Sequence, residues 1–119
     1  MLQTRRVFIA DDQRPARQGL RALLAFMPGV EWIGEAVNGR EAVKQVTEWL
    51  PDVVLMDVHM PVMDGFEATR QIKSQTPEVR VIILTMYPEY ESEAIAAGAD
   101  SFLVKGGTSE ALRTAICCM

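Results

Sequence analysis

The segment DVVLMDVHMPVMDG, residues 52–65, contains the pattern that decides the fold. It opens with an apolar run that predicts a strand buried on both faces, and the run ends at a charged residue, Asp57. Pro61 then redirects the chain, and Asp64 followed by Gly65 predicts the start of a helix with Asp64 as its N-cap. A strand that is apolar on both faces is typical of a parallel sheet covered by helices on both sides. This segment therefore predicts one strand-loop-helix unit of an α/β domain.

The same unit recurs along the chain. Apolar runs predict five strands, at residues 6–10, 30–37, 52–56, 79–84 and 101–104. Amphipathic segments between and after them predict five helices, at residues 14–26, 38–50, 64–74, 90–97 and 108–118. Strict alternation predicts an α/β fold, a doubly wound five-stranded parallel sheet flanked by five helices. The mixed pattern of residues 30–37 favours a position at the edge of that sheet.

Composition limits the classes of protein that the chain can belong to. Its 119 residues, 49% hydrophobic and 24% charged, suit one globular domain. The net charge of −4 provides no basic surface for nucleic acid. No apolar run approaches the roughly 20 residues of a membrane helix, and the N-terminus does not resemble a signal peptide. We therefore expect a single cytoplasmic domain, residues 1–119, that has no contact with a membrane.

Polar residues follow four of the predicted strands. Asp11 and Asp12 follow the first, Asp57 the third, Thr85 the fourth and Lys105 the fifth. Because parallel strands share a direction, these residues should meet at one edge of the sheet. Three neighbouring carboxylates repel one another unless a cation compensates, and hard oxygen ligands favour Mg²⁺. A carboxylate can also attack phosphorus to form an aspartyl phosphate, whose oxygens Mg²⁺, Lys105 and Thr85 could hold.

The polar residues lie in four segments, IADDQ (9–13), LMDVHMPVMDG (55–65), ILT (83–85) and GADSFLVKG (98–106). In this order and spacing, these segments resemble the receiver domain of two-component response regulators. The longer segments DDQRPARQGLRALL (11–24) and LTMYPEYESEAIAAGADSFLVKG (84–106) are similar to the subfamily with a LuxR/NarL/FixJ-type helix-turn-helix output domain. The resemblance covers essentially the whole chain and implies the strand order 2-1-3-4-5.

The resemblance implies a role for each polar residue at the sheet edge. Asp57 would be the phosphoacceptor and also a ligand of Mg²⁺. Asp12 would bind Mg²⁺ directly, Asp11 largely through water, and the backbone carbonyl of His59 would complete the set of protein ligands.

The same resemblance implies how the phosphoryl group is detected. Thr85 and Lys105 would contact the phosphoryl oxygens, and Phe102 would be the aromatic residue that moves with Thr85 in the switch. Gly106 follows Lys105 where the family often has a proline with a cis bond before it. A cis bond to a non-proline residue costs about 3 kcal/mol, so this chain has little reason to form one.

The implied function is a phosphorylation-dependent signalling switch. A sensor histidine kinase would donate the phosphoryl group, and the face formed by helix four, strand five and helix five would change to control an output, transcription in this subfamily. DNA would be contacted only by a C-terminal output domain outside residues 1–119, and the receiver could pair as a homodimer. The only reactions of the domain would be its own phosphotransfer and autodephosphorylation.

Other interpretations of these residues stay open. Asp57 could be a strand-end acid that hydrogen-bonds to a turn, Thr85 could cap a helix, and Phe102 could be a core residue. The imidazole of His59 could act as a ligand or phosphodonor, although a lone histidine among carboxylates is not a typical zinc set.

Two alternative functions are an unphosphorylated interaction module and a small Mg²⁺-dependent aspartyl phosphatase. Such a phosphatase has its nucleophile after strand one, two residues before a second acid, whereas Asp11 and Asp12 are adjacent. A flavodoxin-like flavin site needs a loop rich in glycine, serine and threonine after strand one, which DDQRPAR (11–17) is not.

Overall fold

The computed structural model describes residues 4–117, and it contains every strand and helix predicted from the sequence. Each described boundary lies within one residue of its predicted position, and Cys118, the predicted end of the last helix, lies outside the described residues. A short 3₁₀ turn before the fourth helix was not predicted. In chain order the elements are β1 (Arg5–Ala10), α1 (Arg14–Ala25), β2 (Val30–Ala36), α2 (Gly39–Trp49), β3 (Val53–Met56), α3 (Gly65–Gln75), β4 (Arg80–Thr85), η1 (Pro88–Tyr90), α4 (Glu91–Ala97), β5 (Ser101–Val104) and α5 (Ser109–Cys117).

The five strands form one parallel sheet in the order β2-β1-β3-β4-β5. The predicted order is therefore confirmed, and β2 lies at an edge as its mixed pattern indicated. The winding direction reverses at β1, because β2 lies on one side of it and β3 on the other. In open sheets of this kind, ligands bind beyond the carboxyl ends of the strands at such a reversal.

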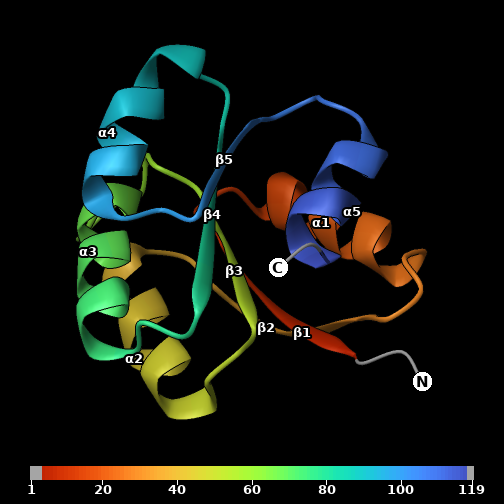
Figure 1. Cartoon of the computed structure of the whole chain (residues 1–119), viewed down its shortest axis with the longest axis horizontal. Coiled ribbons are helices and arrows are strands. Elements are labelled where there is room, and N and C mark those ends of the chain that lie inside the picture. Colours follow the sequence, from red (N-terminus) through yellow and green to blue (C-terminus); the bar gives the residue numbers. More distant parts are fainter. Residues whose placement is uncertain (1–3, 118–119) are drawn as a thin grey trace.

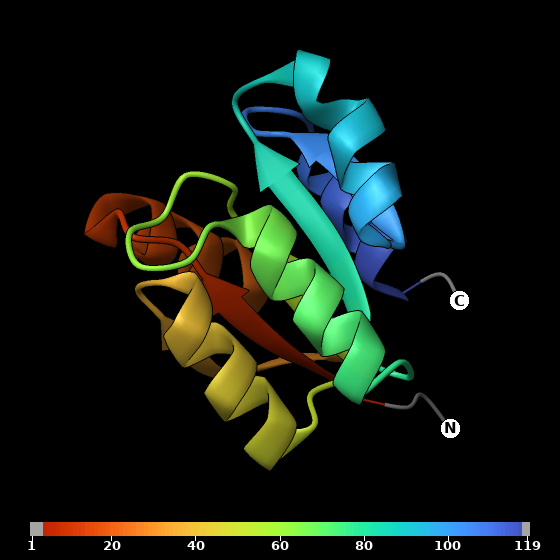
Figure 2. The ribbon, with the colours of Figure 1, turned by 90° about the vertical axis from the view of Figure 1, so that its left-hand side faces the viewer.

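Helices cover both faces of the sheet, with α1 and α5 on one side and α2, α3 and α4 on the other (Figure 1). Figure 2 shows the face that carries the three helices α2, α3 and α4. Alternate residues of β1 divide between two hydrophobic cores: Val7 and Ile9 pack with α1 and α5, while Phe8 and Ala10 pack on the opposite face. This alternation explains why β1 is apolar at four successive positions, Val7 to Ala10, and why β3 is apolar throughout.

Side-chain caps begin α3 and α5, and the cap of α3 is Asp64, as predicted. The Asp64 carboxylate accepts a hydrogen bond of 2.9 Å from the Glu67 N–H at the start of α3. The Thr108 hydroxyl accepts one of 3.0 Å from the Ala111 N–H before α5. Gly98 ends α4 in the left-handed conformation, with φ of 97°. Among residues 4–117, no helix is long and apolar enough to cross a membrane.

Candidate functional site

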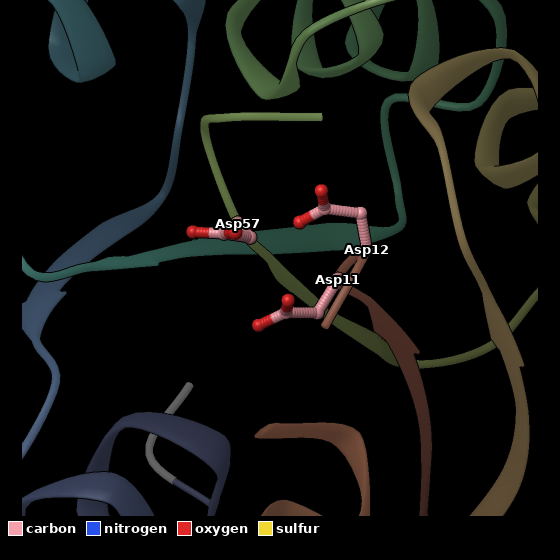
Figure 3. Close-up of side chains that lie close together, drawn as sticks. All are labelled: Asp11, Asp12 and Asp57. Carbon is pink, nitrogen blue, oxygen red and sulfur yellow. The ribbon is translucent and has the colours of Figure 1, made fainter. Parts of the chain in front are cut away.

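Three carboxylates gather beyond the carboxyl ends of β1 and β3. Asp11 and Asp12 follow β1, Asp57 follows β3, and one oxygen of each lies within 4.8 Å of the others. In Figure 3 all three side chains extend toward the same side of the sheet edge. Asp11 is buried, whereas Asp12 and Asp57 are half-buried and accessible to solvent. The fold therefore produces the acidic cluster that the order of the strands predicted.

Backbone contacts hold Asp57 in place. Its N–H donates a hydrogen bond of 2.9 Å to the carbonyl of Ala10, so the register of β1 and β3 continues into the site. The following loop is closed by a bond of 2.9 Å from the Gly65 N–H to the Val58 carbonyl. Gly65 packs so tightly there that a Cβ atom on it would lie 1.9 Å from the carbonyl oxygen of Asp57. The loop and the start of α3 therefore fix the position of Asp57.

Asp11 has hydrogen bonds on its backbone and on its side chain. Its N–H donates to the carbonyl of Ala36 at 3.1 Å, which ties it to β2. Its two carboxylate oxygens accept from the Gln13 N–H at 2.9 Å and from the Lys105 ammonium at 2.8 Å. Its carbonyl accepts from the Arg17 guanidinium at 2.9 Å. Asp11 is thus restrained by four residues from three segments of the chain: the start of α1, the end of β2 and the loop after β5.

Lys105 brings one positive charge to the cluster. Its Nζ lies 2.8 Å from Asp11 Oδ2 and 3.5 Å from Asp57 Oδ1. Its N–H donates to the Thr85 carbonyl at 2.7 Å, which anchors the end of β5 to β4. Burial by itself lowers the pKa of Lys105, but the hydrogen bond to Asp11 and the attraction of Asp57 outweigh burial and raise the pKa above its ordinary value. Lys105 therefore stays charged. The bond from Lys105 to Gly106 is trans, and residues 4–117 contain no cis peptide bond.

One lysine does not neutralise three carboxylates. Burial and the nearby charge of Asp11 raise the pKa of Asp57 above its ordinary value, although Lys105 acts in the opposite direction. The ionised form of Asp57 is therefore destabilised in the cluster as it stands, and a further cation would stabilise it. An all-oxygen donor set that is partly open to solvent fits Mg²⁺, which keeps several waters when it binds to carboxylates.

Thr85 and Phe102 lie on neighbouring strands next to the cluster. Thr85 is the last residue of β4 and is buried, and its hydroxyl accepts a long hydrogen bond of 3.3 Å from the Tyr87 N–H. Phe102 lies in β5 beside Ile83, half-buried against the core on the α2–α4 face. Phe102 thus packs against the core without being fully buried in it, and its movement with Thr85 stays a prediction.

The side chain of His59 is exposed and belongs to an aromatic cluster. Its Nε2 forms a hydrogen bond of 3.0 Å with the hydroxyl of Tyr90, and its ring meets those of Tyr87 and Tyr90 edge-on, with centroids 5.4 Å apart in both cases. The ring of Tyr90 also packs edge-on against Phe66. The imidazole therefore contacts the η1 turn that precedes α4 and the residue before that turn. Whether the backbone carbonyl of His59 binds a metal stays a prediction.

Sequence reasoning missed two residues of this site, Arg17 and Tyr90. The side chain of Arg17 donates to the backbone of Asp11 in the cluster, and the side chain of Tyr90 contacts His59 in the loop after Asp57. The sequence gives only a weak indication of either role, because Arg17 is one of several polar residues in a predicted amphipathic helix and Tyr90 is the first residue of another.

Comparisons with known proteins agree with this geometry. The family model described as the response regulator receiver domain matches residues 7–117. A transcriptional regulatory protein of Bacillus subtilis, YhcZ, is 39% identical over 109 residues, which are 90% of this chain and 51% of that protein. The response regulator VraR of Staphylococcus aureus is 36% identical over 115 residues, 95% of this chain and 55% of that protein. The chain thus spans about half the length of these curated relatives.

Solved structures show the same architecture. The signal receiver domain of the putative response regulator NarL from Mycobacterium tuberculosis superposes with a TM-score of 0.89 at 31% identity, covering 96% of this chain and 94% of that one. A LuxR-family two-component response regulator from Aurantimonas superposes with a TM-score of 0.86, also at 31% identity, covering 98% and 90%.

Proposed function

The chain belongs to the response regulator receiver domain family, and from this premise we propose that it is a phosphorylation switch whose phosphoacceptor is Asp57. The observation that carries the proposal is the cluster of Asp11, Asp12 and Asp57 beside Lys105, at the point where the sheet reverses its winding. Among the three acids, Asp57 combines solvent access with contact to the lysine.

In the proposed reaction an oxygen of Asp57 attacks the phosphorus atom of a donor. The new bond joins Asp57 Oδ to phosphorus, and the bond between phosphorus and the leaving group breaks. When the donor is the phosphohistidine of a sensor kinase, the broken bond is P–N and the imidazole leaves with its electron pair. Asp57 must be ionised to react, and the ammonium of Lys105, 3.5 Å away, favours that form.

The remaining acids would hold Mg²⁺, with Asp12 and Asp57 as direct ligands, Asp11 largely through water, and the carbonyl of His59 as a further ligand. The bound ion would neutralise negative charge on the phosphoryl oxygens. Asp11 also holds Lys105 in place through its bond of 2.8 Å, so the ammonium is available to a phosphoryl oxygen without having to be reoriented.

The switch itself would start at Thr85. Within the described part of the chain its hydroxyl makes only the 3.3 Å contact with the Tyr87 N–H, so it can turn to donate a hydrogen bond to a phosphoryl oxygen. Phe102 would then move with it and alter the face formed by α4, β5 and α5. A preference of a few kcal/mol for the phosphorylated conformation is enough to reverse such an equilibrium.

The partners follow from the family. We propose that a sensor histidine kinase supplies the phosphoryl group and that the altered face controls transcription through an output domain outside residues 1–119. The support is that YhcZ and VraR, named as transcriptional regulatory and response regulator proteins, are about twice as long as the matched region. Homodimerisation through α4 and α5, or through α1 and α5, would fit the same role.

Incubation with acetyl phosphate and Mg²⁺, followed by intact-mass measurement, tests the proposal. We expect one phosphoryl adduct on the wild type and none on Asp57→Asn. The matched control is Asp52→Asn, because Asp52 caps the opposite end of the sheet, where it accepts a hydrogen bond of 2.7 Å from the Arg6 N–H. An adduct that persists in Asp57→Asn, or a wild type that takes up no phosphoryl group, would contradict the proposal.

A further inference from the structure

The guanidinium of Arg17 connects α1 to β2 and to the segment after β1 that carries the acidic pair. Arg17 lies in the first turn of α1, and its side chain is only 11% exposed. Its Nε donates to Glu35 Oε2 of β2 at 2.8 Å, and its Nη1 donates to the backbone carbonyl of Asp11 at 2.9 Å. A charge that is largely removed from solvent is tolerated when it is paired and hydrogen-bonded, and Arg17 meets both conditions.

The carbonyl that Arg17 holds belongs to the peptide between Asp11 and Asp12. Because a peptide unit is planar, restraining this oxygen also restrains the N–H and the Cα of Asp12, which lie in the same plane. The two peptides that flank Asp12 are both restrained: the one before it through this carbonyl, and the one after it through the Gln13 N–H, which donates to the Asp11 carboxylate at 2.9 Å.

We propose that Arg17 is a positioning residue for the cation site: it orients the peptide of the acidic pair so that Asp11 and Asp12 point toward Asp57. The inference rests on the proposed function, since it assumes that the three acids bind Mg²⁺. The described side-chain bonds of Arg17 reach the backbone carbonyl of Asp11 and the carboxylate of Glu35, so it would act through these two groups and not by touching the cation or the phosphoryl group. Groups that orient metal ligands commonly affect affinity strongly.

Charge and positioning make opposite predictions for the loss of Arg17. If only its charge mattered, removing a positive group near a cation site would strengthen cation binding. If Arg17 orients the acidic pair, the same change weakens binding, because the ligands lose their alignment. The sign of the effect therefore separates the two explanations.

Arg21 provides a matched control on the same helix. Its guanidinium lies 3.9 Å from the other oxygen of Glu35 and stacks over Trp32, with 4.1 Å to the ring centroid. Its side chain is 47% exposed, and none of its described bonds reaches Asp11. Arg21→Gln removes the same charge from the same helix without removing the bond to the carbonyl.

The test is a titration of the unphosphorylated protein with Mn²⁺, in which electron paramagnetic resonance measures the concentration of free Mn²⁺. Competition by Mg²⁺ then gives the affinity of the site for Mg²⁺. We expect Arg17→Gln to weaken Mg²⁺ binding roughly tenfold, as is usual for a group that orients metal ligands. Arg21→Gln should match the wild type or bind slightly more tightly. Arg17→Lys, which keeps the charge but cannot form both bonds in the geometry of the guanidinium, should also bind more weakly. Thermal unfolding monitored by circular dichroism establishes that each variant is folded at the assay temperature.

Each result decides the matter. Equal or tighter Mg²⁺ binding by folded Arg17→Gln overturns the inference and leaves the proposed function intact, even if that variant is less stable. If Arg17→Gln does not fold, Arg17→Lys decides by the same criterion. A wild type that binds no Mg²⁺ at these acids overturns both the inference and the proposed metal site.

Discussion

Gly65 packs directly against the backbone of the phosphoacceptor, so Gly65→Ala should affect stability and chemistry together. A Cβ atom at Gly65 would lie 1.9 Å from the carbonyl oxygen of Asp57 and 3.0 Å from the Cα of Val58. These are backbone atoms, which cannot turn away as a flexible side chain would. The loop after β3 and the first turn of α3 must therefore separate by roughly 1.5 Å to reach an ordinary contact distance.

The expected loss of stability combines three contributions. Overpacking of this kind costs about 1–3 kcal/mol. Weakening the bond from the Gly65 N–H to the Val58 carbonyl adds about 1 kcal/mol. Alanine is better than glycine in a helix by up to about 1 kcal/mol, which offsets part of the cost. The free energy of unfolding should therefore fall by about 2 kcal/mol. The same displacement moves the carboxylate of Asp57, and a misplacement near 1 Å can slow a reaction by on the order of a hundredfold.

Urea unfolding and the rate of phosphorylation by acetyl phosphate are the two assays. The control is Gly19→Ala in the middle of α1, where an added Cβ meets nothing within 4 Å. It should stabilise the protein by about 0.4–1 kcal/mol and leave the rate unchanged. If Gly65→Ala behaves like Gly19→Ala in both assays, the contact with Asp57 does not constrain the site and the reasoning is wrong.

Three further predictions concern the surroundings of the cluster. Burial and Asp11 raise the pKa of Asp57 above its ordinary value of 3.8, so ionisation of Asp57 lowers the stability of the folded state as pH rises above 3.8. Without Mg²⁺, Asp57→Asn should therefore have a higher melting temperature than the wild type at pH 7. This difference should disappear below pH 3.8, where the wild-type carboxyl group is protonated in both the folded and the unfolded state. A gap that stays constant across the pH range would argue against this electrostatic origin. The hydrogen bond between His59 and Tyr90 can be tested by a double-mutant cycle of His59→Ala and Tyr90→Phe on the free energy of unfolding, which should show a coupling energy of about 0.5–1 kcal/mol. Additive effects of the two substitutions would mean that the bond does not form in solution. Val62 has a φ of 69°, a backbone conformation that is unfavourable for a β-branched residue. Val62→Gly should therefore raise the free energy of unfolding, measured by urea titration, by up to about 1 kcal/mol. A decrease would show that the turn is not strained.

Much of the site could be predicted because it depends on strand order and direction. Asp11, Asp12 and Asp57 each follow an apolar strand, and a parallel sheet brings such positions to one edge whatever the details of packing. Lys105 reaches the same cluster for the same reason, because β5 runs parallel to β1 and β3 in that sheet.

The remaining features depend on distances between side chains and backbone that periodicity does not encode. The bond from Arg17 to the Asp11 carbonyl requires the exact tilt of α1 against β2, and the same helical pattern would be seen without it. The contact of Tyr90 with His59 depends on the 3₁₀ turn before α4, which has no apolar periodicity of its own. The close approach of Gly65 to Asp57 depends on how the loop after β3 folds back on itself.

The most direct test of the central claim is to locate the phosphoryl group. After treatment with acetyl phosphate and Mg²⁺, borohydride reduces an aspartyl phosphate to homoserine, which tandem mass spectrometry assigns to a position in the sequence. We predict homoserine at position 57 alone, and none when Mg²⁺ is omitted. Homoserine at position 11 or 12, or a phosphoryl group carried by His59 with Asp57 intact, would contradict the assignment of Asp57 as the phosphoacceptor.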